Sequence, residues 1–164
     1  MIGIRRTAAL PIACLLLLPM IPSNAQFDAP KFIKVSPSIP KSVQPGKSFT
    51  MAVAVSIESP YHIQGNPAKE GYITTELEVG PLKGFKIGKV TYPKATTTTM
   101  SGERLPVYEG TIEIKADLTP DKNLKPGKYT LPVVLKYQGC DQQKCFPPTT
   151  LSAKAAIAVK AGMH

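Results

Sequence analysis

The stretch Ser48-Phe-Thr-Met-Ala-Val-Ala-Val-Ser-Ile57 decides the fold that this sequence predicts. Its large apolar side chains occupy every second position: Phe49, Met51, Val53, Val55 and Ile57. Alternation with a period of two, in a segment that contains several β-branched residues, is typical of a strand with one buried face. The segment therefore predicts a strand at the centre of a β-structure.

Segments with similar alternation or with β-branched residues lie on both sides of this strand. They are residues 32–36, 72–79, 85–92, 107–118, 129–138 and 151–159. Turn sequences separate them, and the 164-residue chain contains 17 prolines but no helical pattern over ten residues. The sequence therefore predicts an all-β fold, an antiparallel immunoglobulin-like β-sandwich of seven to eight strands. Because the chain has no Trp and no widely spaced pair of cysteines, it is not an antibody-type domain.

Residues 93–106 interrupt the pattern of alternation. They include four consecutive threonines, Thr96 to Thr99, followed by Met100 and the turn pair Ser101-Gly102. The segment is too polar for a core and has no periodicity, so we expect an exposed loop here.

The first 25 residues predict a secretory signal peptide that is cleaved after Ala25. Arg5 and Arg6 precede an apolar run at 8–21, and small residues precede the expected cleavage site. The run is shorter than the roughly 20 residues that span a bilayer, so we do not expect a membrane anchor. Cys14 would leave with the leader. Residues 26–164 then predict a single exported domain without an integral membrane segment.

The positive charge of the chain does not by itself indicate a nucleic-acid-binding protein. Removal of the leader lowers the formal net charge from +9 to +7, because Arg5 and Arg6 leave and all 11 acidic residues remain. The lysines are single and mostly alternate with apolar residues, which predicts the solvent-facing side of strands and not a polyanion site. They include Lys31, Lys34, Lys41, Lys47, Lys83, Lys86 and Lys89.

Few residues suit hydrolytic or metal chemistry. His62 is the only histidine of the mature chain apart from the terminal His164. We expect it to lie at the end of a strand and to make local hydrogen bonds. Cys140 and Cys145 have no histidine or third cysteine nearby to complete the four ligands of a structural zinc site. We therefore expect no metal site.

Cys140 and Cys145 flank the polar loop 141–144 between two strand-like segments. Residues that face each other across such a hairpin have Cα separations of about 4.5 to 5.5 Å, which overlap the disulfide range. Export would favour a disulfide, although a loop of about six residues constrains the unfolded chain by only about 2 kcal/mol. Lys144 favours a thiolate on Cys145, and Asp141 opposes one on Cys140. The residues alone leave a structural disulfide and a redox pair as alternatives.

The flanks of the two cysteines carry a resemblance to a known family. Tyr137-Gln-Gly-Cys140 and Cys145-Phe146-Pro147-Pro148 resemble the signature of the N-terminal periplasmic domain of the thiol:disulfide interchange protein DsbD. Residues 27–30 (Phe-Asp-Ala-Pro), Tyr61-His-Ile63 and 106–110, which include Tyr108, resemble further parts of that family. The resemblance spans nearly the whole mature chain and implies an immunoglobulin-like sandwich.

The resemblance also implies a function, that of a periplasmic thiol-disulfide exchange module of the protein-disulfide reductase type. The cysteine pair would pass electrons to or from thioredoxin-fold partners, with Cys145 as the exchanging and Cys140 as the resolving residue. No metal or organic cofactor is implied. Because the chain ends before the membrane and thioredoxin-like domains of the proteins it resembles, we expect a separate membrane electron donor. We also expect a monomer. The alternatives are a non-catalytic immunoglobulin-like binding or assembly module with a structural disulfide and, more remotely, a copper-handling protein.

In the family a loop caps the cysteines, and residues 93–105 correspond to it. The threonine run replaces the aromatic residues expected at the tip, so Met100 or Leu105 would have to shield the sulfurs. Pro147 and Pro148 lack backbone N–H groups and should leave Cys145 at a sheet edge. The residues expected to support the cysteine pair are Tyr61, Met100, Tyr108, Tyr137, Lys144, Phe146 and Pro147.

Overall fold

The computed structural model describes residues 31–161, and within this range the chain forms β-strands without a helix. It therefore holds no helix that is long and apolar enough to cross a membrane. The predicted signal peptide 1–25, with Cys14, lies outside the described residues, and so does the motif at 27–30.

Two four-stranded sheets form the sandwich, with eight strands in all, as the sequence predicted. The first has the order β1-β3-β9-β6 and contains β1 (Ile33–Ser38), β3 (Phe49–Ile57), β9 (Thr111–Pro120) and β6 (Phe85–Thr91). The second has the order β2-β12-β10-β5 and contains β2 (Ser42–Val43), β12 (Thr149–Val159), β10 (Gly127–Tyr137) and β5 (Glu76–Val79). All neighbours are antiparallel except β2 and β12, which form a short parallel pair.

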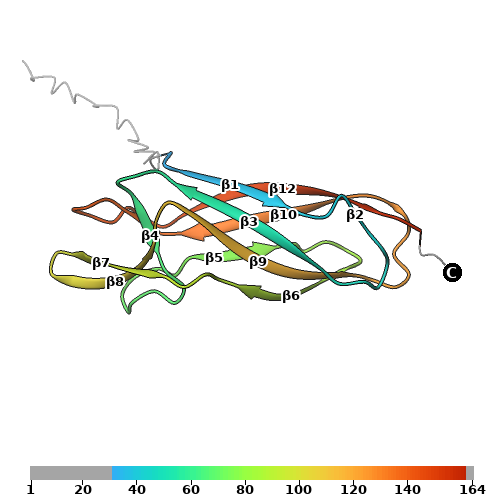
Figure 1. Ribbon diagram of the computed structural model, residues 1–164, viewed down its shortest axis with the longest axis horizontal. Helices are drawn as coiled ribbons and strands as arrows, with labels where there is room; N and C mark the ends of the chain where they lie inside the picture. Colours follow the sequence, from blue (N-terminus) through green and yellow to red (C-terminus); the bar gives the residue numbers. More distant parts are fainter. Residues whose placement is uncertain (1–30, 162–164) are drawn as a thin grey trace, which may run out of the picture.

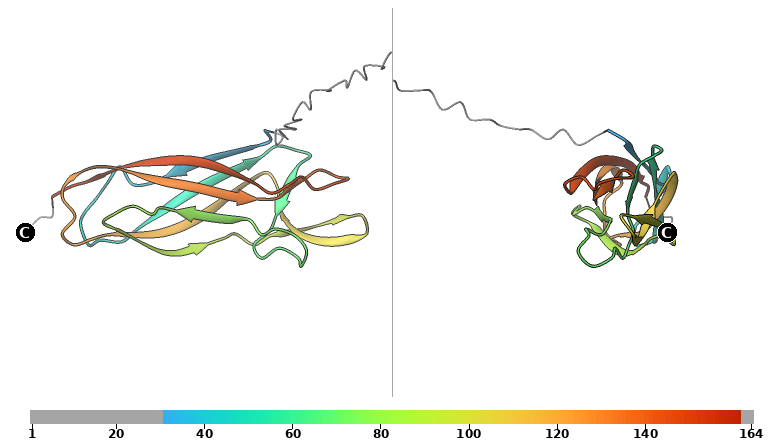
Figure 2. Two further views of the ribbon diagram at one scale, coloured as in Figure 1. Left: turned by 180° about the vertical axis from the view of Figure 1, so that it is seen from behind. Right: turned by 90° about the vertical axis from the view of Figure 1, so that its left-hand side faces the viewer.

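Buried and partly exposed residues alternate along β3 in the same way as the apolar residues that predicted this strand. Met51, Val53 and Val55 are completely buried, and the residues between them are partly exposed. Val53 pairs with Ile114 of β9, so the buried faces of the two central strands coincide. Apolar residues of β5, β10 and β12 cover this face from the second sheet and complete one continuous core. The end-on view of Figure 2 shows the strands of both sheets around it.

A third sheet, which the sequence did not predict, closes one end of the sandwich. Its order is β11-β4-β8-β7, with β11 (Gly139–Cys140), β4 (His62–Gln64), β8 (Glu103–Tyr108) and β7 (Thr96–Met100). Figure 1 shows β4, β7 and β8 at this end, and β2 and the end of β12 at the other. The residues that connect β10 to β12, which include both cysteines, lie at the same end as β7 and β8.

The expectation of an exposed loop at 93–106 is wrong, because most of this segment forms the hairpin β7–β8. Threonine is β-branched and favours the extended backbone of a strand even where no face is buried. Ser101 and Gly102 have positive φ angles of 50° and 82°, which suit the tight two-residue turn between paired strands. Polarity thus identified the exposure of most of the threonines but not the backbone conformation or the burial of Met100 and Leu105.

Two other predicted strands are shorter in the structure. The predicted strand 107–118 is divided between β8 and β9 by a turn in which Gly110 has a φ angle of 63°. The predicted strand 72–79 is a strand only over β5, because the preceding residues contact side chains of other segments: the backbone N–H of Ile73 donates to Gln138 Oε1. Glycine at the left-handed position explains the first break, and side-chain hydrogen bonding explains the second.

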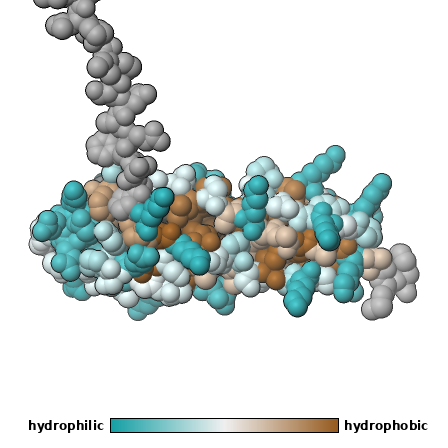
Figure 3. All heavy atoms as spheres, turned by 90° about the horizontal axis from the view of Figure 1, so that it is seen from above, coloured by the Kyte–Doolittle hydropathy of each residue, from teal (hydrophilic) through white to brown (hydrophobic). Residues whose placement is uncertain are grey.

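The lysines are exposed, as their alternation predicted, in strands at Lys34, Lys86 and Lys89 and just outside strands at Lys41 and Lys83. Lys34, Lys41, Lys83, Lys86 and Lys89 are all exposed. Figure 3 shows hydrophilic side chains that project from the surface around apolar areas of the strands.

Candidate functional site

Cys140 and Cys145 form the predicted disulfide within a short hairpin, residues 139–146, which we call the cysteine loop. The N–H of Phe146 donates to the carbonyl of Gly139 at 2.8 Å, and the N–H of Asp141 donates to the carbonyl of Lys144 at 3.0 Å. Between these bonds the cysteines occupy a non-hydrogen-bonded position, where facing residues come closest. Their Cα atoms are 3.9 Å apart, closer than the range predicted from the sequence.

Asp141 fixes the turn of the cysteine loop. Its Oδ1 accepts hydrogen bonds from the backbone N–H groups of Gln143 at 2.7 Å and of Lys144 at 2.8 Å. These bonds hold the pKa of the Asp141 carboxyl below its usual value. The carboxylate that was expected to oppose a thiolate on Cys140 thus accepts hydrogen bonds from the backbone of the loop.

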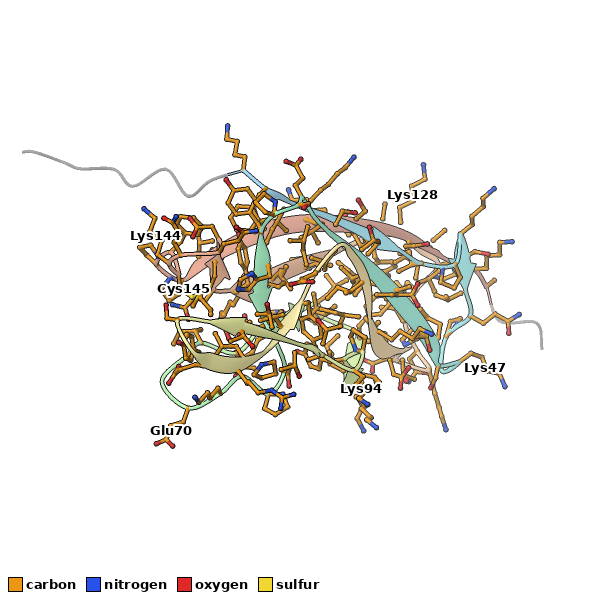
Figure 4. The ribbon with its side chains drawn as sticks, turned by 60° about the vertical axis from the view of Figure 1, so that its left-hand side comes forward. Lys47, Glu70, Lys94, Lys128, Lys144 and Cys145 are labelled. Atoms are coloured by element: carbon orange, nitrogen blue, oxygen red, sulfur yellow. A yellow bond between two sulfur atoms is a disulfide. The ribbon has the colours of Figure 1, made fainter. Side chains whose placement is uncertain are left out.

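The hairpin β7–β8 covers the two sulfurs unequally. Cys140 is completely buried in a small apolar group with Met100, Leu105 and Val107, which we call the cysteine cluster. Cys145 is partly buried and packs against this cluster, as does Tyr72. Met100 and Leu105, the two residues expected to shield the sulfurs, both belong to the cluster. Figure 4 shows Cys145 and Lys144 together at this end, away from Lys47 and Lys128.

Exposed polar contacts attach the tip of the hairpin to the loop that precedes β5. Glu103 forms an ion pair with Lys69 at 3.1 Å and accepts a hydrogen bond from the Tyr72 hydroxyl at 3.0 Å. The hydrogen bonds from Lys69 and Tyr72 lower the pKa of Glu103, and the bond to Glu103 raises the pKa of Tyr72. Solvent-exposed ion pairs contribute about 0–1 kcal/mol, so this attachment is weak.

Gln64, which sequence reasoning missed, contacts both sulfurs. Its side chain is completely buried, and its Nε2 donates to Cys140 Sγ at 3.3 Å and to Cys145 Sγ at 3.8 Å. Its Oε1 is buried and has no hydrogen-bond partner. The one signal in the sequence that could have pointed to Gln64 was its position. It directly follows the motif Tyr61-His-Ile63, in a short strand with inward-facing residues.

His62 lies on the same strand and pairs with Cys140 across β4 and β11. It is at a strand end, as predicted, but it is buried and its Nε2 has no hydrogen-bond partner, so the expectation of local bonds fails for this atom. Burial lowers the pKa of His62, against the opposing effect of Glu109 and Asp141. Burial therefore favours the neutral form of the imidazole.

Aromatic side chains pack together on the other side of the cysteine loop. Phe32 and Tyr61 are stacked, with ring centroids 4.3 Å apart. The Phe146 ring lies 6.0 Å from Phe32 and 6.2 Å from Tyr61, and Tyr137 meets Phe32 edge-on at 6.3 Å. Lys144 Nζ lies 5.9 Å from the Phe146 ring centroid, within the range of a cation–π contact. Four of the expected supporting residues thus surround the cysteine loop on this side.

Tyr108 and Pro147 lie differently. Tyr108 is buried in the main core, where its hydroxyl donates to the carbonyl of Pro93 at 3.1 Å and accepts from the N–H of Asn66 at 3.2 Å. It anchors the base of the hairpin and does not belong to the cysteine cluster. Pro147 is exposed, and β12 begins only at Thr149, which is consistent with prolines that delay strand pairing.

Within residues 31–161 no group of three or more His, Cys, Asp or Glu side chains is placed to hold a metal ion. The chemistry that the described residues offer at this end of the sandwich is that of a disulfide with one buried and one partly buried sulfur.

Comparisons with known proteins agree with this fold and place the chain in a family. The family model for the N-terminal domain of the thiol:disulfide interchange protein DsbD matches residues 29–156. The DsbD N-terminal domain of Neisseria meningitidis in its reduced form has a TM-score of 0.51 at 17% identity, over 82% of this chain and 94% of that one.

The N-terminal periplasmic domain of ScsB from Proteus mirabilis has a TM-score of 0.56 at 12% identity, over 76% of this chain and 46% of that one. At these identities the structural matches show a shared fold, the immunoglobulin-like sandwich. No curated protein sequence matches the chain significantly.

Proposed function

The chain belongs to the DsbD N-terminal domain family, and from this membership we propose that it is a thiol-disulfide exchange module of the periplasm. In this function the Cys140–Cys145 pair passes electrons to or from thioredoxin-fold partners. Residues 26–164 form the mature domain after the signal peptide has been removed.

The main observation in support of this proposal is that the disulfide adds little to the fold as a cross-link. The residues that flank it are already joined by backbone hydrogen bonds, from Phe146 to Gly139 and from Asp141 to Lys144. A disulfide across about six residues restricts the unfolded chain by only about 2 kcal/mol, and the sandwich has its own continuous core. A bond that contributes little to the fold, in a family of interchange proteins, is better explained by exchange.

Unequal burial of the sulfurs supports the roles proposed for them in the exchange. Cys145, the more exposed residue, attacks one sulfur of the partner disulfide as a thiolate, and the other partner sulfur leaves as a thiolate. The completely buried Cys140 then attacks Cys145 Sγ, which releases the partner. The partner disulfide is thereby reduced to a dithiol, and this chain is oxidised. The reverse sequence transfers the electrons in the other direction.

Access to the sulfurs requires movement of the hairpin β7–β8. Met100 and Leu105 cover Cys140, and the tip of the hairpin is attached by exposed contacts of Glu103. Such contacts are individually weak, so the docking of a partner can displace the tip without loss of the main core. The hairpin then acts as a cap, with aliphatic residues in place of aromatic ones.

A trapping experiment tests the proposed function. The Cys140→Ala variant retains the attacking residue but cannot resolve, so it should accumulate a mixed disulfide with a thioredoxin-fold protein in periplasmic extract. The Cys145→Ala variant is the matched control and should trap much less. The wild-type reduction potential should lie above about −300 mV, in the range of exchange proteins. A disulfide that resists reduction in the folded chain, with no trapped protein, would overturn the proposal.

The complete burial of Cys140 favours a second candidate, a binding or assembly module in which the disulfide is structural. Under this alternative the reduced chain would have no partner that accepts its electrons. The trapping experiment distinguishes the two candidates, because a structural disulfide gives no mixed disulfide with either variant.

A further inference from the structure

Only one of the two polar atoms of the Gln64 carboxamide has hydrogen-bond partners. Its Nε2 donates to the two sulfurs, whereas its Oε1 is completely enclosed without a donor. Burial of an acceptor without a hydrogen bond costs free energy, and native structures usually avoid it. A second such atom, Nε2 of His62, lies on the same strand, opposite Cys140 in the pairing of β4 and β11. These are the two unpartnered buried side-chain nitrogen or oxygen atoms within residues 31–161.

The oxidised cysteine pair cannot provide the missing donor, because disulfide sulfurs carry no hydrogen and act only as weak acceptors. Reduction changes this, since each thiol gains an S–H group. A carboxamide matches a reduced pair in which one sulfur is a thiolate and the other a thiol. Its Nε2 then donates to the thiolate, and its Oε1 accepts from the thiol. Gln64 is therefore better matched to the reduced pair than to the disulfide.

The geometry also indicates which sulfur benefits more. Gln64 Nε2 is closer to Cys140 Sγ, at 3.3 Å, than to Cys145 Sγ, at 3.8 Å. Cys140 is completely buried among the apolar side chains of the cysteine cluster, so its thiolate has no access to water. In the described part of the chain, the side-chain hydrogen bonds to either sulfur come from Gln64 alone. A thiolate on Cys140 depends on this donor.

We propose that Gln64 is a catalytic residue of the exchange, which favours the reduced cysteine pair and stabilises the thiolate of Cys140. This inference rests on the proposed function and deepens it. In the mixed disulfide between Cys145 and the partner, Cys140 loses its proton to water that reaches it once the hairpin β7–β8 is displaced, and Gln64 Nε2 donates to the resulting thiolate. The thiolate attacks Cys145 Sγ, the bond between Cys145 and the partner breaks, and the electron pair leaves on the partner sulfur, which is protonated by water.

The backbone holds Gln64 in place for this role. Its N–H donates to the carbonyl of Gln138 at 3.0 Å, two residues before Cys140, and its carbonyl accepts from the hydroxyl of the buried Thr75. Strand β4 is paired on both sides, with β11 and β8. The backbone of Gln64 is thus fixed relative to Cys140 by hydrogen bonds that do not depend on the redox state of the sulfurs.

Two substitutions separate the parts of the proposal. Gln64→Met keeps the length of the side chain and removes both donor and acceptor. Gln64→Glu keeps the shape and the acceptor but replaces the donor with an oxygen that opposes a thiolate when ionised. Tyr92→Phe is the matched control, because it removes a hydrogen bond from the backbone N–H of Leu77 at the main core and leaves Gln64 and the sulfurs unchanged. Thermal unfolding of each purified chain shows that it is folded.

The first measurement is the equilibrium of each chain with reduced and oxidised glutathione. Gln64→Met should lower the equilibrium constant for reduction about tenfold, which corresponds to about 30 mV for two electrons. The second is the pKa of Cys140 in a Cys145→Ser background, from the ultraviolet absorbance of the thiolate. It should rise with Gln64→Met and rise further with Gln64→Glu. The third is the lifetime of the mixed disulfide with a thioredoxin-fold protein, which both substitutions should lengthen.

An unchanged equilibrium constant and an unchanged Cys140 pKa in both Gln64 variants would overturn the inference. A shift of the same size in Tyr92→Phe would also overturn it, because the effect would then follow from lost stability. The glutathione equilibrium and the pKa need no protein partner. If they shift as expected while wild type traps no partner, then the proposed function has failed and the role of Gln64 toward the sulfurs stands. If Gln64→Met does not fold, the Gln64→Glu results decide.

Discussion

The ring of Phe32 lies directly against Gly139, the residue before the buried cysteine. A Cβ added at position 139 would overlap with Cζ of this ring and lie 3.1 Å from its Cε2. Phe32 is itself stacked on Tyr61 and buried, so it cannot simply turn away. The cysteine loop therefore begins at a position where the packing admits only glycine.

Gly139→Ala should destabilise the fold by about 1–3 kcal/mol, the usual cost of an overpacked core site. Either Phe32 or β11 must shift, and β11 carries Cys140. Urea unfolding of wild type and variant measures the difference. Gly127→Ala is a suitable control, because its added Cβ would meet only Tyr129, at 3.7 Å. Equal effects of the two substitutions would contradict this account of the packing.

Reduction of the disulfide should leave the sandwich folded. The loop that it closes is short, so the loss should be about 2 kcal/mol, and the double variant Cys140→Ala/Cys145→Ala should behave similarly apart from the cavity left at the buried site. Urea unfolding with and without reductant measures the loss for wild type. Complete unfolding on reduction at room temperature would show that the disulfide is structural and would argue against exchange.

The cover over the sulfurs can be tested on Met100. Met100→Ala shortens a side chain of the cysteine cluster, and it should make the disulfide react several times faster with a small thiol such as dithiothreitol. Thr97→Ala, an exposed position on the same hairpin, should leave the rate unchanged. If both variants reacted at the wild-type rate, the hairpin would not be the barrier to reagent access.

Sequence patterns predicted the parts of this structure that have a repeating or signature element. Alternation at Met51, Val53 and Val55 predicted a central strand because burial on one face of a sheet repeats every two residues. The flanks of Cys140 and Cys145 predicted the pair because their local motif is specific.

The remaining features have no such signal. The threonine strand β7 is mostly exposed, so no alternation marks it. The partner of Gln64, Cys140, is 76 residues away in the sequence, and a buried hydrogen bond of this kind leaves no local pattern. The break after Tyr108 depends on the conformation of Gly110, which becomes clear only once the strands are paired. Contacts between distant segments, more than local preference, therefore build this end of the molecule.

His62 should make the stability of the fold depend on pH. Burial lowers its folded-state pKa below the ordinary value of 6.5, so the unfolded chain binds more protons between these two values. Stability from this residue is therefore complete above about pH 7 and falls as the pH drops through 6.5 toward the folded-state pKa. Asp141 acts in the same direction only at lower pH, near and below its ordinary value of 3.8. Urea unfolding at about pH 5 and about pH 8 should show the loss in wild type, and His62→Gln should reduce it. A loss of equal size in the variant would assign the pH dependence to other groups and would contradict a neutral, buried His62.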